Sequence, residues 1–518
     1  MGRMRMLLLL AVIVISAAGQ TWVARYNGSA NDEDVAVGVA CDDSGCVYVT
    51  GTSWSASSGN DIVTIKYSST GQLVWQASYD GAAHGSDEAR AIAVRGDRVV
   101  VTGGSAEVNL FTDMLTAVYR TAGELVWSVL YGSPGGGNDH GLATGFDSAG
   151  NVITAGFATY YDSTGWDFVT VKYSPDGAEQ WSRRCATEYE DFVSAVAVDA
   201  AGNVYVTGSS GNPYMLTWDY MTVKYSPDGT ERWVVRYNGP AGEDDEPHGI
   251  AVDAAGNVYV TGGSLDSVSG MDFTTIKYSP DGQVVWIRRY DGPAAGLDEA
   301  NAIALDGAGN IYVTGYSQGT TTDMDYATVK YDPDGNQLWV RRYDGPVGGY
   351  DEARAIAVDH AGGVYVTGSS TGSGTRADYA TVKYSSDGEE LWVQRYDGPA
   401  SRLDEAVAVA TDRLGGVYVT GGSSGSGTGT DYATLRYPAT GVAEPAHEAS
   451  CIAGRVPRAT VRRQVSDLPE PGSVLLDISG RRVRRFEPGG NGLSGLGQGV
   501  YFVWLETGGR FLKLVVTD

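Results

Sequence analysis

Two sets of aspartates recur at regular spacing along most of the chain, and carboxylates in such a pattern suit either metal binding or loop capping. One set precedes a short apolar segment in each repeat, and the other follows a Gly/Ser-rich stretch. Carboxylate oxygens are the ligands that Ca²⁺ prefers, although no DxDxDG loop accompanies these residues. Asp also accepts backbone N–H groups within its own turn, and recurrence in all eight repeats favours that capping role. The first set is Asp32, Asp87, Asp139, Asp191, Asp245, Asp298, Asp351 and Asp404, and the second is Asp61, Asp113, Asp167, Asp219, Asp272, Asp325, Asp378 and Asp431.

Aromatic residues interrupt a few of the loops that are otherwise rich in Gly, Ser and Thr. Aromatic rings on a hydrophilic loop surface can stack on sugar rings or hold a peptide, and they can equally pack on neighbouring loops. Two of them immediately precede a second-set Asp, one repeat apart, which predicts equivalent positions on adjacent units. We take the following as candidate ligand-binding residues: Trp54, Tyr160, Tyr161, Trp166, Tyr214 and Trp218.

The remaining reactive residue types give weaker patterns. The five His show no ligand spacing, and we assign no catalytic residue. Cys41 and Cys46 bracket a turn, DDSG, that would let them form a disulfide in an oxidising compartment or remain free thiols. Cys185 and Cys451 have no evident partner, and the chain lacks the paired CxxC spacing of a zinc site.

A repeat of about 53 residues positions these groups. Four segments per unit, such as WVRRY, EARAIAV, GVYVTG and DYATVKY after Trp339, are rich in β-branched or aromatic residues and are bounded by Gly, Asp, Ser or Pro. A period of this length with four short strands is typical of β-propeller blades. A Trp opens one strand of each unit, at positions 22, 75, 127, 181, 233, 286, 339 and 392.

The connections predict two different ends for the propeller. Tight turns such as DAAGN and SPDG alternate along the chain with longer loops such as DGPxxGxDE, so all long loops share one face. The Arg-bearing Trp strand suits an exposed outermost edge. The units begin with a Trp strand and end without one at Tyr437, so eight blades are complete only if the N-terminal strand joins the last blade.

The repeat resembles a known family. AVAVDAAGNVYVTGSS followed by DYMTVKYSPDG, between Ala195 and Gly229, is similar to the seven-bladed β-propeller (SBBP) repeat of secreted bacterial proteins. The resemblance implies a secreted propeller, and the strand count predicts eight blades rather than seven. SPDGAEQW and KYSSTGQLVW are similar to the sialidase Asp-box and to quinoprotein dehydrogenase repeats, but they also suit a general turn-and-Trp packing solution.

The termini predict an export route. Residues 1–19 have a basic start, an apolar run and small residues before the expected cleavage point, which is typical of a secretory signal peptide. Residues 439–455 form a predicted linker, and residues 456–518 a predicted small Ig-like β-sandwich. LLDISGRRV and GVYFVWLETGGRFLKLVV resemble the C-terminal sorting domain of the bacterial type IX secretion system, which implies contact with that machinery.

Composition excludes some functions. The formal charge is −26 and the pI about 4.5, which argues against nucleic-acid binding because phosphate recognition needs a basic face. We expect no membrane span in the mature chain and no cofactor other than the Ca²⁺ considered above. The sequence thus predicts an all-β protein with an eight-bladed propeller at 20–438, secreted or at the cell surface, that binds an extracellular glycan, peptide or protein. The alternative is a polysaccharide-active hydrolase or lyase that uses the central funnel.

Overall fold

The computed structural model of this 518-residue chain describes residues 21–438, except 108–110, 135, 161–164, 188 and 213–216, together with four strands near the C-terminus. The chain divides into two compact units, Met1–Ile452 and Ala453–Asp518. Within the described residues, no helix has the length and apolarity needed to cross a bilayer.

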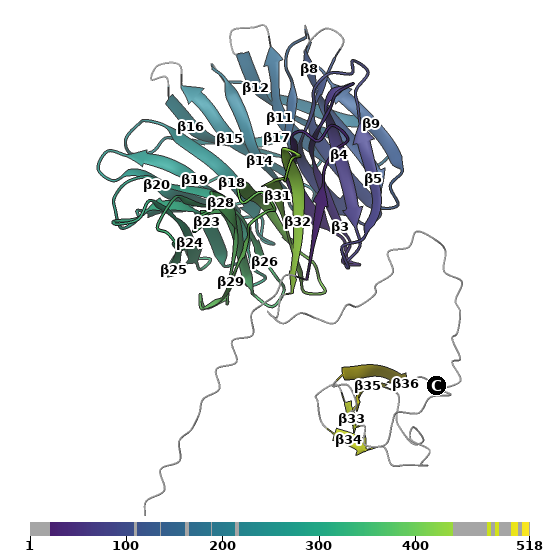
Figure 1. Cartoon of the computed structure of the whole chain (residues 1–518). Helices are drawn as coiled ribbons and strands as arrows, with labels where there is room; N and C mark the ends of the chain where they lie inside the picture. The colour runs from purple at the N-terminus through teal and green to yellow at the C-terminus, as the bar shows by residue number, and fades with distance from the viewer. Residues whose placement is uncertain are drawn as a thin grey trace, which may run out of the picture. The chain divides into compact units, whose positions relative to one another are not determined.

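The first unit consists of eight four-stranded antiparallel sheets, which confirms the predicted eight-bladed propeller (Figure 1). The innermost strands are β2 (Asp34–Cys41), β6 (Asp87–Arg95), β10 (His140–Phe146), β14 (Asp191–Val198), β18 (Asp245–Val252), β22 (Asp298–Leu305), β26 (Asp351–Val358) and β30 (Asp404–Thr411). The second strands are β3 (Val47–Ser55), β7 (Arg98–Ala106), β11 (Val152–Tyr160), β15 (Val204–Asn212), β19 (Val258–Asp266), β23 (Ile311–Gln318), β27 (Val364–Thr371) and β31 (Gly416–Ser424).

The third strands are β4 (Gly59–Tyr67), β8 (Thr112–Arg120), β12 (Gly165–Tyr173), β16 (Thr217–Tyr225), β20 (Gly270–Tyr278), β24 (Met324–Tyr331), β28 (Ala377–Tyr384) and β32 (Thr430–Pro438). The outermost strands carry the repeated Trp, as expected for an exposed edge. They are β5 (Leu73–Tyr79), β9 (Leu125–Tyr131), β13 (Glu179–Cys185), β17 (Glu231–Tyr237), β21 (Val284–Tyr290), β25 (Gln337–Tyr343), β29 (Glu390–Tyr396) and β1 (Trp22–Tyr26).

The ring closes through the N-terminal strand, as predicted. β1 pairs antiparallel with β32, with Trp22 opposite Arg436 and Tyr26 opposite Tyr432, so the eighth blade contains both ends of the propeller (Figure 1). Each innermost strand contacts the innermost strands of both neighbouring blades, and β30 contacts β2. The eight innermost strands therefore surround a common axis.

The hydrophobic core lies between adjacent blades. Val and Tyr side chains of the second and third strands are buried on both faces, which explains why these strands lack a polar alternation. The outer Trp locks each junction: Trp339 donates its indole N–H to the Ser386 carbonyl of the next blade across 3.1 Å. The ring also lies against Gly388, which has φ +81 and whose Cβ would come within 2.9 Å of it. Glycine at this turn thus serves both the backbone conformation and the Trp packing.

In the second unit, four strands form one antiparallel sheet in the order β34-β33-β35-β36. A β-sandwich needs a second sheet, so the predicted Ig-like sandwich stays a prediction. The predicted signal peptide 1–19 and linker 439–455 lie outside the described residues. The strands are β33 (Val474–Asp477), β34 (Arg482–Arg485), β35 (Gly499–Leu505) and β36 (Arg510–Val516).

Candidate functional site

The first set of aspartates caps the long loops. Asp351, at the start of β26, is fully buried and accepts the backbone N–H of Gly345 across 2.5 Å and that of Thr371 across 2.9 Å. Six other aspartates of this set each accept a backbone N–H from the loop that leads into their own strand. They are Asp87, Asp139, Asp191, Asp245, Asp298 and Asp404. These bonds give each carboxylate a structural role.

One member of this set was assigned to the wrong residue. Asp32 is exposed and lies in the loop, whereas Asp34 begins β2, is buried and accepts the Gly28 N–H across 2.6 Å. The DE pair at Asp32 imitates the repeat motif. The distance from the preceding Tyr was the better signal, because Asp34 follows Tyr26 by the same interval that separates Asp87 from Tyr79.

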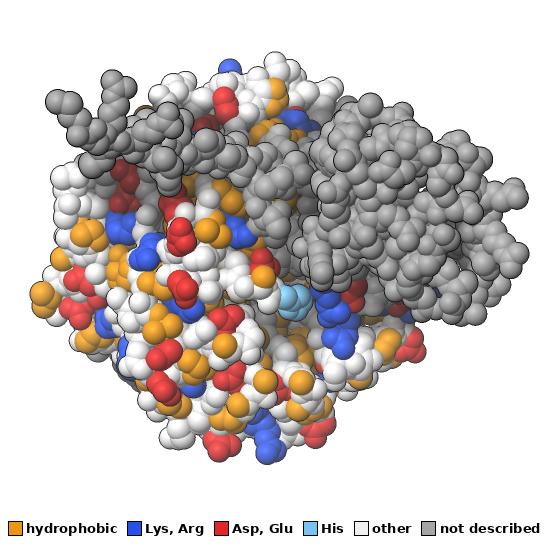
Figure 2. Space-filling model, turned by 90° about the horizontal axis from the view of Figure 1, so that it is seen from below, with side chains coloured by type: hydrophobic (Ala, Val, Ile, Leu, Met, Phe, Trp, Pro, Cys, Tyr) orange, Lys and Arg blue, Asp and Glu red, His pale blue; other side chains and the backbone are white. Residues whose placement is uncertain are grey.

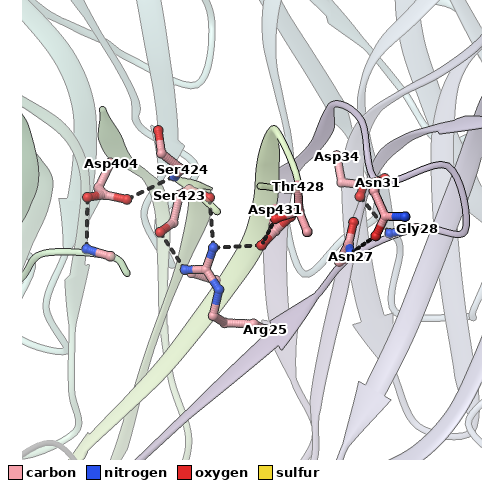
Figure 3. Close-up of polar contacts among 12 residues, drawn as sticks. Arg25, Asn27, Gly28, Asn31, Asp34, Asp404, Ser423, Ser424, Thr428 and Asp431 are labelled. Carbon is pink, nitrogen blue, oxygen red and sulfur yellow. Dashed lines mark hydrogen bonds and ion pairs between the residues drawn. The ribbon is translucent and has the colours of Figure 1, made fainter. Parts of the chain in front are cut away.

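The second set of aspartates meets the outermost strand through arginine. Asp431 of β32 accepts an N–H of Arg25, from β1, across 2.8 Å, and Figure 3 shows the guanidinium between Asp431 and Ser423. Ion pairs of the same type join Arg184 to Asp167, Arg236 to Asp219, Arg289 to Asp272, Arg342 to Asp325 and Arg395 to Asp378. In the first two blades the arginine is replaced by Ser78 and Leu130.

Both sets come together at several blade junctions. One carboxylate oxygen from each of Asp325, Asp344 and Asp351 lies within 4.8 Å of the others, and similar groups form around Asp61, Asp272 and Asp378. Burial raises the pKa of Asp351, and the nearby Asp344 carboxylate acts in the same direction. Three carboxylates are a donor set that suits Ca²⁺. Capping bonds and ion pairs engage some of these carboxylate oxygens, so metal binding stays a prediction.

Two of the predicted aromatic residues, Trp166 on blade three and Trp218 on blade four, form part of a row of rings. Trp166 and Trp218 lie at corresponding register positions, one blade apart, and Phe192 lies between them with ring centroids at 5.0 and 5.3 Å. Phe157 extends the row, at 5.6 Å from Trp166 and 5.5 Å from Phe192, and His140 is 5.2 Å from Phe157. All five side chains are half-buried. We call His140, Phe157, Trp166, Phe192 and Trp218 the aromatic row.

Two further predicted aromatic residues that the structure describes, Trp54 and Tyr160, do not join this row. Trp54, on β3, has 40% of its surface exposed and lies in a different blade. Tyr160 packs under the guanidinium of Arg184, 3.8 Å from its ring centroid, and shares a hydrogen bond with Tyr131 across 3.2 Å. Tyr161 and Tyr214 lie outside the described residues. Phe157 and Phe192 lie on β11 and β14, outside the segments before the third strands that supplied most of the predicted residues. Trp166 and Trp218 also lie on strands, at the starts of β12 and β16.

A cluster on the innermost strands was also missed. His248 Nε2 lies 2.6 Å from Glu299 Oε1, and the hydroxyl of Tyr316 donates to the other Glu299 oxygen. One ligand atom from each of Glu246, His248 and Glu299 lies within 4.8 Å of the others. Such a set could hold a metal ion or exchange protons. We call Glu246, His248, Glu299 and Tyr316 the axial cluster.

The two carboxylates of the axial cluster have opposite pKa shifts. Burial raises the pKa of Glu246 above its usual value. Burial acts on Glu299 in the same sense, but hydrogen bonds from His248 and Tyr316 outweigh it and lower the pKa of that carboxyl. The position of His248 arises from a β-bulge between Pro247 and Gly249, and bulges often redirect side chains in this way.

The predicted disulfide between Cys41 and Cys46 does not form. Cys41 is a free thiol that donates to the Thr411 carbonyl, and Cys46 is disulfide-bonded, but not to Cys41. In the hairpin, Cys41 lies opposite Val47, so Cys41 and Cys46 point to opposite faces of the blade. Burial raises the pKa of the Cys41 thiol to about 12, which makes it unreactive near neutral pH. Cys185 is free and buried.

Comparisons with known proteins agree with the repeat assignment. The SBBP beta-propeller repeat family matches residues 180–214, 233–265, 285–320 and 339–374, so the chain carries SBBP repeats. An uncharacterized WD repeat-containing protein of Acanthamoeba polyphaga mimivirus is 24% identical over 430 residues, which cover 74% of this chain. The chain spans only 28% of the length of that relative.

Two solved structures are similar at low identity. The extracellular domains 1-2 of Drosophila Semaphorin 1b give a TM-score of 0.37 at 9% identity, covering 80% of this chain and 86% of that one. A eukaryotic initiation factor gives a TM-score of 0.36 at 11% identity, covering 70% and 88%. Both TM-scores are below 0.5, so neither likeness bears on function.

Proposed function

We propose that the chain is a secreted or cell-surface binding scaffold whose long-loop face holds an extracellular glycan, peptide or protein. Support comes from the architecture: capped loops on a closed ring provide a rigid surface on which a few exceptional side chains can act. A rigid surface limits the conformational entropy that is lost on binding.

The aromatic row is the observation that carries this proposal. Its rings continue across a blade junction, from Phe157 and Trp166 to Phe192 and Trp218, and they remain half-exposed at the end of the blades where the long loops emerge. Contiguous, partly exposed aromatic surface on a soluble protein is typical of ligand contacts. Contacts within the row hold the rings in fixed positions. The same rings can therefore pack on one another and present their exposed surface to a ligand.

Charge restricts the ligand. The chain carries 63 Asp and Glu against 37 Lys and Arg, and both signs are interspersed over the surface seen in Figure 2. Both aspartate sets lie at the long-loop end, and the arginines that pair with six of the second set offset only part of their charge. An anionic ligand would be repelled there, so we propose a neutral or cationic one.

Export is a separate part of the proposal. It is supported by the signal-like residues 1–19 and by the similarity of the C-terminal residues to a type IX sorting domain. Fractionation of a host with that secretion system tests it: the full chain should appear on the cell surface or in the medium, and deletion of 456–518 should retain it in the periplasm. Cytoplasmic recovery of the full chain would contradict export.

The binding proposal is tested with the full chain on immobilised glycan and peptide arrays. Trp166→Ala/Trp218→Ala should lose the binding that the native chain shows, with only a modest decrease in melting temperature because both side chains are only partly buried. Leu338→Ala/Leu391→Ala, on exposed residues at the tight-turn end, is the matched control and should bind normally. Equal binding by the native chain and the Trp variant would contradict the proposal.

The axial cluster supports a second candidate, a hydrolase or lyase acting on a polysaccharide in the central funnel. Glu246, with a raised pKa, would donate a proton, and Glu299, with a lowered pKa, would act as base or nucleophile. Release of reducing ends or unsaturated products from a polysaccharide panel tests this candidate. Glu246→Gln and Glu299→Gln should each abolish such activity, while Glu352→Gln, the corresponding residue on β26, should retain it.

A further inference from the structure

In four of the blades, a polar slot holds an arginine from the outermost strand. Arg25 donates to the Tyr396 hydroxyl of the preceding blade across 2.8 Å, to the Ser423 hydroxyl and carbonyl across 2.6 and 2.9 Å, and to Asp431 across 2.8 Å. Figure 3 shows the contacts with Ser423 and Asp431. Arg289, Arg342 and Arg395 make the same set of contacts in their own slots. A Tyr, a Ser and an Asp therefore form a guanidinium site at each of these junctions.

Blade one retains this site without its arginine. Tyr26, Ser53 and Asp61 occupy the Tyr, Ser and Asp positions, and Ser78 stands where the other blades have arginine. A pocket of about 420 Å³ results, and Tyr26, Ser53, Asp61 and Ser78 all line it. The described residues of its lining include no Lys or Arg.

The Asp61 carboxylate points to a cationic occupant. Only 9% of Asp61 is exposed, and Oδ2 accepts only the Ser58 hydroxyl. Oδ1 lacks a hydrogen-bond partner here, as it does in the arginine-filled slots. In the slots that hold arginine, Oδ2 of the matching Asp also accepts an N–H of the guanidinium. Burial raises the pKa of Asp61, and Asp80 and Asp87 act in the same direction, which a bound cation would reverse. A buried carboxylate of this kind is costly unless it is paired.

The neighbouring residues favour a guanidinium group over an ammonium group. The slot offers hydroxyl, carbonyl and carboxylate acceptors in the fork arrangement that arginine satisfies in the other blades, and a lysine ammonium cannot reach all of them at once. Trp54, which lines the same pocket and is 40% exposed, adds an aromatic surface suited to a guanidinium plane.

From these observations we propose that the pocket beside Ser78 binds an arginine side chain presented by a peptide or protein. This inference deepens the proposed binding function, because the pocket opens among the long loops and gives that face a defined ligand class. Free arginine fits less well, since it brings an additional carboxylate to a pocket whose described lining contains Asp61 and no Lys or Arg.

Blade two supplies an internal control. Leu130 fills the corresponding position there, and its side chain packs in the core between the first two blades. Asp113 is the matching carboxylate of this closed slot. Asp113→Asn removes a carboxylate from the matching position, as Asp61→Asn does in blade one. Asp113 does not line the open pocket, so this substitution leaves the pocket unchanged.

The test is calorimetric titration of the full chain with N-acetyl-arginine amide, beside N-acetyl-lysine amide and free L-arginine. The arginine amide should bind most tightly. Asp61→Asn should weaken its binding about tenfold or more, because a charged hydrogen bond is lost, and Asp113→Asn should leave it unchanged. Ser78→Arg should abolish binding and raise the melting temperature, because its own guanidinium would fill the slot; that rise shows that the variant is folded.

Normal binding by Ser78→Arg, or equal effects of Asp61→Asn and Asp113→Asn, would overturn the proposal. Equal affinity for free L-arginine would overturn its peptide part. Should CaCl₂ rather than the arginine amide bind, and do so only with Asp61 intact, the pocket is a metal site and the proposal is wrong. Trp166→Ala/Trp218→Ala should retain arginine binding, so failure of the aromatic row and failure of this pocket are distinguishable.

Discussion

The guanidinium of Arg25 donates to the carboxylate of Asp431 across 2.8 Å, although the two residues are 406 positions apart in the sequence. Arg25 lies on the first strand of the propeller and Asp431 on its last, and their side chains are largely shielded from solvent. The pair therefore repeats across the seam the same contact that stabilises the interior of other blades. Closure of the ring therefore uses the same Arg–Asp ion pair as the other blades, with its arginine supplied by the N-terminal strand.

Removal of the closing strand should destabilise the propeller strongly. Deletion of residues 21–26 leaves β32 with an unpaired edge and Asp431 without its arginine, and a closed ring has no capping repeat to compensate. We expect a loss of several kcal/mol, against about 2 kcal/mol for Arg342→Ala, which breaks the same pair inside one blade. Thermal unfolding measures both, and an unchanged melting temperature for the deletion would contradict closure by β1.

The capping aspartates should be structural whether or not metal is present. Asp351→Ala leaves the buried N–H groups of Gly345 and Thr371 without their acceptor, so unfolding should become easier by about 2 kcal/mol. Urea titrations with EDTA and with CaCl₂ should give the same difference. A native chain that Ca²⁺ stabilises strongly, next to an insensitive variant, would instead indicate a metal site.

Stability should increase as the pH falls from 7.5 to 5. Burial raises the pKa of Asp191 to about 6, above its unfolded value near 4, so its contribution is full below the unfolded pKa and is lost as the pH rises through 6. Asp191→Asn should remove on the order of 2 kcal/mol of this dependence. A melting temperature that is flat over this range would contradict the assignment.

Below about pH 4 the trend should reverse. Burial tends to raise the pKa of Asp253, but hydrogen bonds from Asn257 and neighbouring groups outweigh it and lower the pKa, so this contribution disappears as the carboxylate becomes protonated. Asp199 and Asp306 occupy the same turn in other blades and behave alike. The stability maximum should therefore lie near pH 5.

The turn glycines allow the Trp packing to be measured separately from backbone strain. Gly388 has φ +81, and an added Cβ would lie 2.9 Å from Trp339; Gly374 has φ +88 with no atom within 4 Å of an added Cβ. Both Ala variants incur the cost of positive φ, about 1 kcal/mol. Gly388→Ala should cost about 1–3 kcal/mol more because it crowds the indole. Equal melting temperatures for the two variants would show that the Trp contact is unimportant.

The repeat period predicted the blades, their number and the closing strand. It could do so because the recurring Trp marks the same strand in every repeat. The site was harder to predict. Phe192, Glu246 and Glu299 each follow a capping Asp, and only the three-dimensional structure shows which side chains gather around this position. The DE pair at Asp32 resembles the repeat motif, whereas the distance from Tyr26 identifies Asp34 as the capping residue.

Contacts between blades explain the remaining differences. The role of Ser78 depends on Tyr26 and Asp61, which come from other strands, so its importance appears only when the slots are compared. Cys41 and Cys46 are close in sequence, yet strand pairing directs their side chains apart. The role of a residue that contacts a neighbouring blade cannot be predicted from the residues next to it in the sequence.

Hydrogen–deuterium exchange of the full chain tests most directly whether the long-loop face is the binding surface. The measurement compares the free chain with its complex with the tightest-binding compound from the glycan and peptide arrays. We predict that protection is confined to the long-loop ends, such as residues 26–34, 157–160 and 217–219. Protection of the tight turns at 279–283 and 332–336, with the long loops unchanged, would contradict the account.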